Sequence, residues 1–206
     1  MSALPDDEGP GCLARPEAVL RRRTLLDRPH IRPLVNYVGE LQGRRLGYVP
    51  DFDPADGGTE ARLLFLMEKP GPRTCPPIGS GFVSRDNAGP SARTLRSFLA
   101  EAGVPRHGTV LWNTIPWWNG TIAMTSAEKR SGAAEIVLLL EYLPKLRGVV
   151  LAGNLAAELG APHFKHIGLK IFRSVHPSVQ ARIGPRSRER WLQLPTLWRE
   201  AWQAVA

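Results

Sequence analysis

Four short apolar runs, separated by segments with helical periodicity, constrain the fold of this chain more than any other feature. The runs are "ARLLFLME" (61–68), "TVLWNTIP" (109–116), "GVVLAGN" (148–154) and "LKIFRSV" (169–175). Short continuous apolar runs are typical of strands buried on both faces, and strands that alternate with helices favour a parallel sheet. We therefore predict an α/β fold, a three-layer α/β/α sandwich with a mainly parallel central sheet of about four strands.

Helical patterns occupy the intervals between these runs. Apolar residues at helical spacing predict helices in 16–42 (divided by Pro29 and Pro33), 91–103, 125–146, after residue 154, and in 187–205. We expect Ser91 to cap the helix at 91–103. The acidic, proline-rich residues 1–15 predict a flexible tail, and residues 16–206 predict a single domain.

The stretch that follows each predicted strand is polar or turn-forming: "MEKPG", "WNTIPWW", "AGN" and "HPS". The carboxyl ends of parallel strands meet at one edge of the sheet, where open α/β sheets bind their ligands. The stretch 69–90, rich in glycine and proline, also starts at this edge, and loops of this length within a domain are usually functional. The sequence therefore predicts one shared pocket at this edge.

The charge and the cysteine content limit the classes of ligand. The 206 residues carry a net charge of +8 with a pI near 10.2, which favours an anionic partner such as nucleic acid. Cys12 and Cys75 are the only cysteines, too few for a disulfide framework, a four-cysteine zinc site or a four-cysteine iron–sulfur cluster. We expect no metal and no cofactor. Because the sequence has neither a secretory signal nor an apolar run of about 18 residues, we expect a cytoplasmic protein.

Taken in order, these segments resemble the motifs of the uracil-DNA glycosylase superfamily. "MEKPG" (67–71) is similar to the first motif, and "GFVSRDNAGPSARTL" (81–95) resembles the loop whose aromatic residue stacks on the extruded base. Three later segments resemble the later motifs: "LWNT" (111–114), "VVLAGNLAAELG" (149–160) and "HPS" (176–178). The resemblance covers about residues 60–205, and it implies a branch without an iron–sulfur cluster that hydrolyses the N-glycosidic bond of uracil in DNA.

The resemblance and the chemistry of this reaction assign roles to His176 and Asn113. Cleavage of an N-glycosidic bond leaves negative charge on the base, and a neutral His176 would stabilise it by donating an N–H to uracil O2. The side chain of Asn113 carries a donor and an acceptor, which match O4 and N3–H of uracil and not the reversed pattern of cytosine. A structural histidine at a strand end, and an asparagine that satisfies turn backbone, are the alternatives.

Further residues receive roles from the same motifs. Phe82 would stack on the flipped base, with core packing as the alternative. Either Glu68 or Asp86 would position the attacking water. Lys69 stands where several branches carry aspartate or asparagine, and it would contact a phosphate, tune the carboxylate or attack the sugar as an amine. Gly71 stands where the strictest uracil enzymes carry a tyrosine that excludes the methyl group of thymine, so methyl rejection must come from elsewhere or be incomplete.

The surroundings of the pocket are expected to contact DNA. Ser91, in a predicted first helical turn, and Ser178 are candidates for binding phosphate. The basic segment after the histidine supplies candidates for the phosphate backbone, with a solvated basic face as the alternative: Arg182, Arg186 and Arg188. Either Ile183 or Arg182 would fill the gap left by the extruded base.

The sequence thus predicts a monofunctional uracil-DNA glycosylase of base-excision repair, which flips the base out of the stack and acts as a monomer. Other deaminated bases are further candidate substrates. One alternative is a non-catalytic DNA-binding module of the same fold, which Lys69 in the first motif would favour. The other is an unrelated α/β enzyme for nucleotides or phosphate esters, against which "KPGPRTCPPIGSG" lacks the spacing of a phosphate-binding loop.

Overall fold

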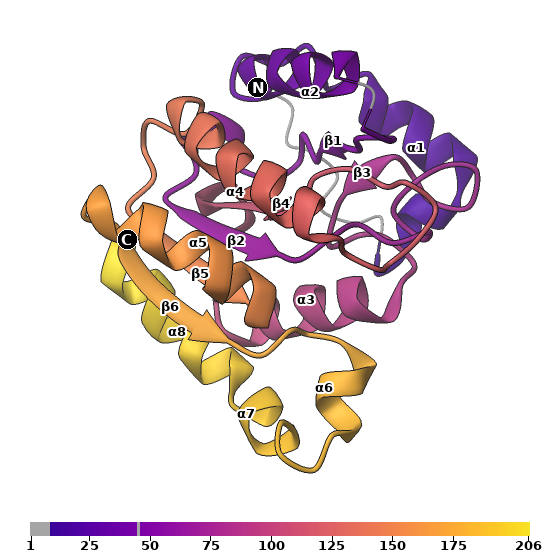
Figure 1. Ribbon diagram of the computed structural model, residues 1–206. Helices are drawn as coiled ribbons and strands as arrows, with labels where there is room; N and C mark the ends of the chain where they lie inside the picture. The colour runs from indigo at the N-terminus through magenta and orange to yellow at the C-terminus, as the bar shows by residue number, and fades with distance from the viewer. Residues whose placement is uncertain (1–8, 45) are drawn as a thin grey trace.

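The computed structural model of the chain describes residues 9–44 and 46–206, and it contains a four-stranded parallel sheet (Figure 1). The strands lie in the order β4-β2-β5-β6 and comprise β2 (Leu63–Met67), β4 (Thr109–Asn113), β5 (Gly148–Ala152) and β6 (Lys170–Ser174). All three pairings are parallel. The prediction of an α/β fold with a mainly parallel sheet of four strands is confirmed.

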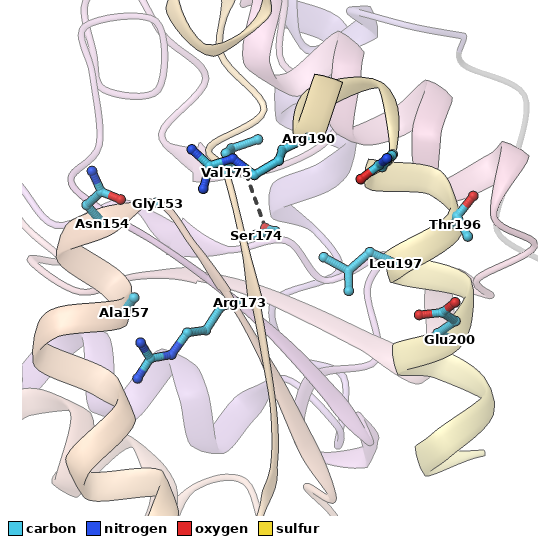
Figure 2. A pocket seen from close by; sticks show the side chains of 11 residues that line it. Gly153, Asn154, Ala157, Arg173, Ser174, Val175, Arg190, Thr196, Leu197 and Glu200 are labelled. Atoms are coloured by element: carbon cyan, nitrogen blue, oxygen red, sulfur yellow. Dashed lines mark hydrogen bonds between the residues drawn. The ribbon is translucent and has the colours of Figure 1, made fainter. Parts of the chain in front are cut away.

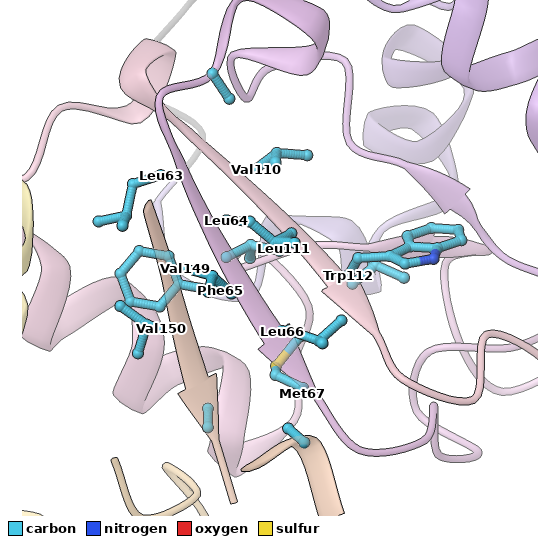
Figure 3. Close-up of a cluster of buried hydrophobic side chains, with 14 of the residues drawn as sticks. Leu63, Leu64, Phe65, Leu66, Met67, Val110, Leu111, Trp112, Val149 and Val150 are labelled. Carbon is cyan, nitrogen blue, oxygen red and sulfur yellow. The ribbon is translucent and has the colours of Figure 1, made fainter. Parts of the chain in front are cut away.

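The core is built around β2, whose residues are all buried. Phe65 lies opposite Leu111 of β4 and Val150 of β5, so apolar side chains of the three strands form continuous rows (Figure 3). Burial of each such side chain stabilises the fold by about 1.5–3 kcal/mol. The apolar run at 61–68 is therefore a central strand because both of its faces must be covered.

Helices cover the two faces of the sheet, with α4 (Ser126–Glu141) and α5 (Asn154–His166) on one face and α3 (Pro90–Glu101) and α8 (Leu194–Val205) on the other (Figure 1). Successive side chains of β2 point to opposite faces of the sheet and therefore contact the two helical layers in turn. Phe65 meets Trp198 of α8 with ring centroids 5.2 Å apart. Leu66 lies on the α5 side, next to Gly160. The predicted three-layer sandwich is confirmed.

The amino-terminal part adds α1 (Pro16–Arg23), α2 (Arg32–Gly43) and a two-stranded parallel sheet of β1 (Asp51–Phe52) and β3 (Phe82–Val83). The prediction of a flexible tail over 1–15 is wrong for its second half. Residues Cys12–Ala14 form a 3-10 helix, and Cys12 and Leu13 are buried against Phe82. Residues 1–8 lie outside the described part of the chain.

Several predicted boundaries change. The α3 helix begins at Pro90 after the cap residue Gly89, so Ser91 lies in its first turn and is not its cap. The α4 helix is capped by Thr125, whose hydroxyl forms a capping box with the Glu128 side chain. The predicted helix at 187–205 is divided at Gln193 into α7 (Arg188–Leu192) and α8. A short helix that was not predicted, α6 (Val179–Ile183), precedes them. No helix within the described residues has the length and apolar character required to cross a bilayer.

Candidate active site

A cavity of about 390 Å³ opens beside the carboxyl ends of β2 and β4 and the first turn of α3. Its wall comes from two loops, residues 69–74 after β2 and residues 83–89 before α3. The cavity brings together five of the side chains or backbones predicted from the sequence, which are Lys69, Gly71, Ser91, Asn113 and His176. The segments after β2, β4 and β6 therefore meet at this cavity as predicted, whereas Gly153 and Asn154, after β5, line a different cavity.

Asn113 is the last residue of β4 and lies opposite Met67 at the end of β2. Its side chain is 6% exposed. The next residue, Thr114, fixes this strand end, because its amide and its hydroxyl both donate to the carbonyl of Met67 at 2.8 Å. Among the described residues no group forms a hydrogen bond with the side-chain amide of Asn113. Both the donor and the acceptor of this side chain therefore remain available to a ligand.

His176 follows β6 and reaches the same cavity from the other side of β2. Its ring is half-buried, and burial lowers its pKa below the ordinary value, although the negative charge of Glu68 opposes this change. The imidazole is therefore neutral at pH 7, which leaves one ring N–H to donate. A neutral donor is the form required for stabilising charge on a leaving base.

Glu68 lies at the junction of β2 and α5. Its Oε1 accepts a hydrogen bond from the amide of Leu155 at 3.2 Å, in the first turn of α5. A side chain at Gly153 would place its Cβ 2.6 Å from the same oxygen, and Gly153 has φ of 112°, so this position requires glycine. The carboxylate is thus held at the positive end of a helix, close enough to act on the pKa of His176.

Lys69 lines the cavity, but its amine is fully engaged. The Nζ atom donates to Asn119 Oδ1 at 2.8 Å, to the carbonyl of Ala123 at 3.0 Å and to Glu128 Oε1 at 2.7 Å. The side chain is 3% exposed. These contacts contradict a role as phosphate ligand or as amine nucleophile. Lys69 instead connects the cavity wall to the loop before α4, which contains Asn119 and Ala123, and to Glu128 in the first turn of α4.

Gly71 leaves open space in the cavity wall, since a Cβ built on it meets no atom within 4 Å. No aromatic side chain of Phe, Tyr or Trp lines the cavity in the described part of the chain. The position that would carry a methyl-excluding tyrosine is therefore an opening.

Phe82 does not line the cavity, and the predicted stacking role is corrected. Neighbouring residues of a strand point to opposite faces, so Val83 faces the cavity while Phe82 points away. The Phe82 ring is fully buried among Cys12, Leu13 and Ala18, with the guanidinium of Arg23 5.2 Å from its centroid. Phe82 therefore packs in the hydrophobic core, which was the alternative to stacking on a base.

Asp86 is also removed from the cavity, and its predicted role in positioning water is corrected. Its carboxylate is 1% exposed and accepts from Arg22 at 3.0 Å, from Arg106 at 2.7 Å and from Arg96. Burial would raise the pKa of Asp86, but the charge of Arg106 and its hydrogen bond outweigh burial and lower the pKa. The carboxylate therefore stays ionised inside a network of arginines.

This network, which we call the buried ion cluster, consists of Arg22, Asp53, Asp56, Ser84, Arg85, Asp86, Arg96 and Arg106. Asp53 accepts from Arg22 at 2.6 Å and from Arg106 at 2.7 Å, so it links α1 to the segment before β4. The cluster includes three residues of the loop at 83–89 and connects that loop to α1 and to the segment before β4. Sequence patterns missed it because its members are far apart in the chain and become neighbours only in the folded protein.

Two polar residues of the cavity wall were also missed. Ser84 and Asn87 line the cavity, and both are already paired. Asn87 accepts from Ser80 Oγ at 2.6 Å and donates to the carbonyl of Phe82 at 2.8 Å, while the Ser84 hydroxyl donates to Asp53. The polar letters "SRDN" were the available signal, but they did not reveal which side chains face the cavity.

The predicted DNA contacts lie around this opening. Ser91 lines the cavity in the first turn of α3. Ser178 caps α6, since its hydroxyl accepts from the amide of Ala181 at 3.3 Å. The remaining candidates are exposed on α6, on α7 and in the turn between them, beyond the carboxyl end of β6 (Figure 1): Arg182, Ile183, Arg186 and Arg188. Ile183 is 67% exposed.

In residues 9–44 and 46–206, no group of three or more His, Cys, Asp and Glu side chains is arranged to hold a metal ion. The cavity itself offers a neutral donor at His176 and a donor and acceptor at Asn113. Glu68 does not line the cavity, but its carboxylate is close enough to act on His176. Such a set suits recognition of a planar base and stabilisation of charge that develops on it.

Comparison with known families agrees with this geometry. Among curated proteins, none matches the chain. The family model described as the uracil DNA glycosylase superfamily matches residues 54–205, which include every strand of the central sheet and all the side chains discussed at the cavity. The chain therefore belongs to the uracil DNA glycosylase superfamily.

Proposed function

We propose that this protein is a monofunctional DNA glycosylase that, as a monomer, hydrolyses the N-glycosidic bond of uracil in DNA, and also releases other deaminated bases. The observation that carries the proposal is the placement of Asn113 and His176 at one cavity, with the Glu68 carboxylate beside His176. Membership of the superfamily supports a glycosylase-like function. The choice of base is argued from the side chains.

Asn113 reads the base in this proposal. Its amide is buried and unpaired among the described residues, so an unmatched base would leave a buried polar group without a partner, which costs about 1–3 kcal/mol. Uracil satisfies the amide through O4 and N3–H. Cytosine presents the opposite pattern at these atoms and is rejected.

His176 and Glu68 divide the work of bond cleavage. The neutral imidazole donates to uracil O2 as the electron pair of the glycosidic bond moves onto the base. The carboxylate of Glu68 stabilises the positive charge left on the sugar and positions the water that attacks C1′. The water's oxygen forms the new bond to C1′, its proton goes to Glu68, and the base departs as an anion held by His176.

The open wall at Gly71 and the absence of an aromatic side chain set the range of bases. Without a side chain at Gly71, nothing at that position rejects a 5-substituent. Apolar side chains of Met67, Val83 and Leu95 line the cavity, and they replace an aromatic platform against the flipped base. This wall supports our inclusion of bases beyond uracil.

A duplex oligonucleotide with one uracil and an end label tests the proposal. After incubation with the protein, hot alkali converts abasic sites into strand breaks that a gel resolves. We expect breaks with the wild type, and a loss of about 10²–10³-fold in the single-turnover rate for His176→Ala and Asn113→Ala. The matched controls are His166→Ala and Asn36→Ala, which change exposed residues on α5 and α2 and should keep the wild-type rate.

Two results would count against the proposal. Binding of the uracil duplex without base release would favour the non-catalytic module, and Lys69 in the first motif is the feature that points to it. Turnover of free nucleotides with no effect on DNA would favour an unrelated α/β enzyme.

A further inference from the structure

The outer edge of β6 is open. The strand is the last in the order of the sheet, and among the described residues no strand pairs with its far side. Lys170 donates to the carbonyl of Arg147 at 3.1 Å, and Ser174 accepts from Gly153 at 3.0 Å, so these two residues direct their backbone groups toward the β5 side. Backbone groups alternate in direction along a strand. Ile171 and Arg173 therefore present N–H and C=O groups to the open side.

The space next to this edge is a slot between two helices (Figure 2). A cavity of about 640 Å³ lies between the start of α5 and α8, and is lined by Ala157, Ser174 and Leu197. A second cavity, of about 590 Å³, lies on the α5 side and is lined by Ile171 and Ala161. Arg173 lines both cavities, so the two are neighbours at this edge. One more strand placed here would be covered on both faces.

The charges of this slot favour an acidic occupant. Arg173, Lys165 and Arg190 line it, all three are exposed, and none has an ion pair within the described residues. A second copy of the chain pairing through this edge would bring Lys170 and Arg173 of both copies together, and neighbouring like charges destabilise strand pairing. The occupant is therefore a different chain with negative side chains.

A peptide fits this edge better than a nucleic acid. The outward carbonyls of Ile171 and Arg173 need hydrogen-bond donors, whereas the phosphates of DNA offer only acceptors. Glu158 and Glu200 also line the two walls and oppose any anionic occupant, but the three basic side chains outnumber them. An extended backbone supplies donors and acceptors at the spacing of the edge.

We propose that the open edge of β6 binds an extended acidic segment of a partner protein, which adds a fifth strand to the sheet. Acidic side chains of the segment face Arg173 and Lys165 on the α5 side. Its apolar side chains, which alternate with the acidic ones, cover Leu197 on the α8 side. This surface is separate from the cavity that holds Asn113 and His176, and the inference does not depend on the proposed glycosylase activity.

The probe is a fluorescein-labelled eight-residue peptide in which valine alternates with aspartate or glutamate, measured by fluorescence anisotropy with the full chain. Three companion peptides carry lysine at the acidic positions, N-methyl groups on one backbone edge, or N-methyl groups on the other. We expect the acidic peptide to bind and the lysine peptide to fail. N-methylation of one edge should abolish binding, because it removes the pairing donors, while methylation of the other edge should not.

Protein variants locate the site. Arg173→Glu should weaken the acidic peptide by about 10-fold and improve the lysine peptide, because the charge facing the segment is reversed. Arg130→Glu, an exposed arginine on α4, is the matched control and should bind like the wild type. Hydrogen exchange should slow at the amides of Ile171 and Arg173 when the peptide binds, and stay unchanged at Lys170 and Ser174.

Four results would overturn the inference. They are no binding of the acidic peptide, equal binding of both N-methylated peptides, displacement of the peptide by uracil-free duplex DNA, and a dimer in sedimentation that Arg173→Glu dissociates. The third would assign the slot to nucleic acid, and the fourth would assign it to a second copy of the chain.

Discussion

Glu68 and Leu155 tie the end of β2 to the start of α5, through a hydrogen bond of 3.2 Å from the Leu155 amide to Oε1 of the carboxylate. The helix start holds one oxygen of Glu68 in place and leaves the charge beside His176. Asp86, the other predicted carboxylate, is enclosed by arginines away from the cavity. The two carboxylates therefore have separable roles.

Substitution of each carboxylate by its amide should separate rate from stability. Glu68→Gln keeps an acceptor for the Leu155 amide, so we expect little change in the free energy of unfolding and a fall of about 10²–10⁴-fold in base release. Asp86→Asn removes a charge from the buried ion cluster and should lower the free energy of unfolding by about 3–5 kcal/mol. Urea denaturation and single-turnover rates measure the two effects. An Asp86→Asn protein of normal stability that has lost base release would contradict this assignment.

The pH dependence of base release should follow the neutral form of His176. Burial lowers the pKa of His176, and the charge of Glu68 opposes this only in part. The pKa in the folded protein therefore lies below the ordinary value of 6.5, and the imidazole is still neutral at that pH. We expect a rate that is constant from pH 8 down through the ordinary pKa of 6.5 and that falls at lower pH as the ring takes up a proton. Stability should also fall below the unfolded pKa, because the unfolded chain binds that proton more readily. A rate that rises on acidification through pH 6 would show that the imidazolium is the active form.

Lys69 should form no covalent link to the sugar. Its amine has hydrogen bonds to Asn119, Ala123 and Glu128 and a side chain that is 3% exposed. We expect borohydride, which traps an imine between an amine and an abasic sugar, to yield no protein–DNA product. Trapped product that disappears in Lys69→Met would prove that the amine leaves its partners and acts as a lyase.

The pair of Lys69 and Glu128 should add stability that acid removes. Burial tends to raise the pKa of Glu128, but the hydrogen bonds from Lys69 and Thr125 outweigh it and lower the pKa to about 2, against 4.5 in the unfolded chain. The stabilisation is fully present above pH 4.5 and is lost as the pH falls toward 2. In Lys69→Met the stability should depend less steeply on pH across this window, as thermal unfolding at a series of pH values would reveal. Parallel curves for the two proteins would be inconsistent with this linkage.

A side chain at Gly71 should narrow the range of bases. The built Cβ meets no atom within 4 Å, so Gly71→Ala should be tolerated and serves as the control. Gly71→Tyr places a ring in the open wall, and we expect release of 5-substituted uracils to fall at least about 10-fold more than release of uracil. Competition between oligonucleotides that carry the two bases measures this ratio. An equal loss for both bases would place methyl discrimination elsewhere in the cavity.

The central sheet was predictable from sequence because its strands are short apolar runs, of which β2, β4 and β5 are buried along their whole length. The run at 61–68 became β2 (Leu63–Met67), and the run at 148–154 became β5 (Gly148–Ala152). The short pairing of Phe52 with Val83 was not predictable, because two-residue strands carry no periodicity. The α5 helix continues through Pro162 to His166, because it packs its apolar face on β5 and β6.

The residues of the candidate site likewise fall into those that could be placed from the sequence and those that could not. Asn113 and His176 could be placed because Asn113 ends one strand and His176 comes two residues after another, and strand ends meet at one edge. Phe82 and Asp86 could not, since the face on which a loop residue lies depends on pairing with β1 and on arginines distant in sequence. The role of each placed residue in catalysis stays a prediction until base release is measured.

The parallel order of the sheet has a consequence for how the protein matures. His176 reaches the cavity only when β6 docks on β5, and β6 needs α8 to shield one of its faces. More than sixty residues separate Asn113 from His176, so the two can meet only through a contact between remote parts of the chain. Contacts of this kind are the slow ones to form. A chain that lacks β6 and α8 therefore cannot place His176 at the cavity. Under the proposed function, competence for base release would then require the carboxyl-terminal part of the fold to have docked.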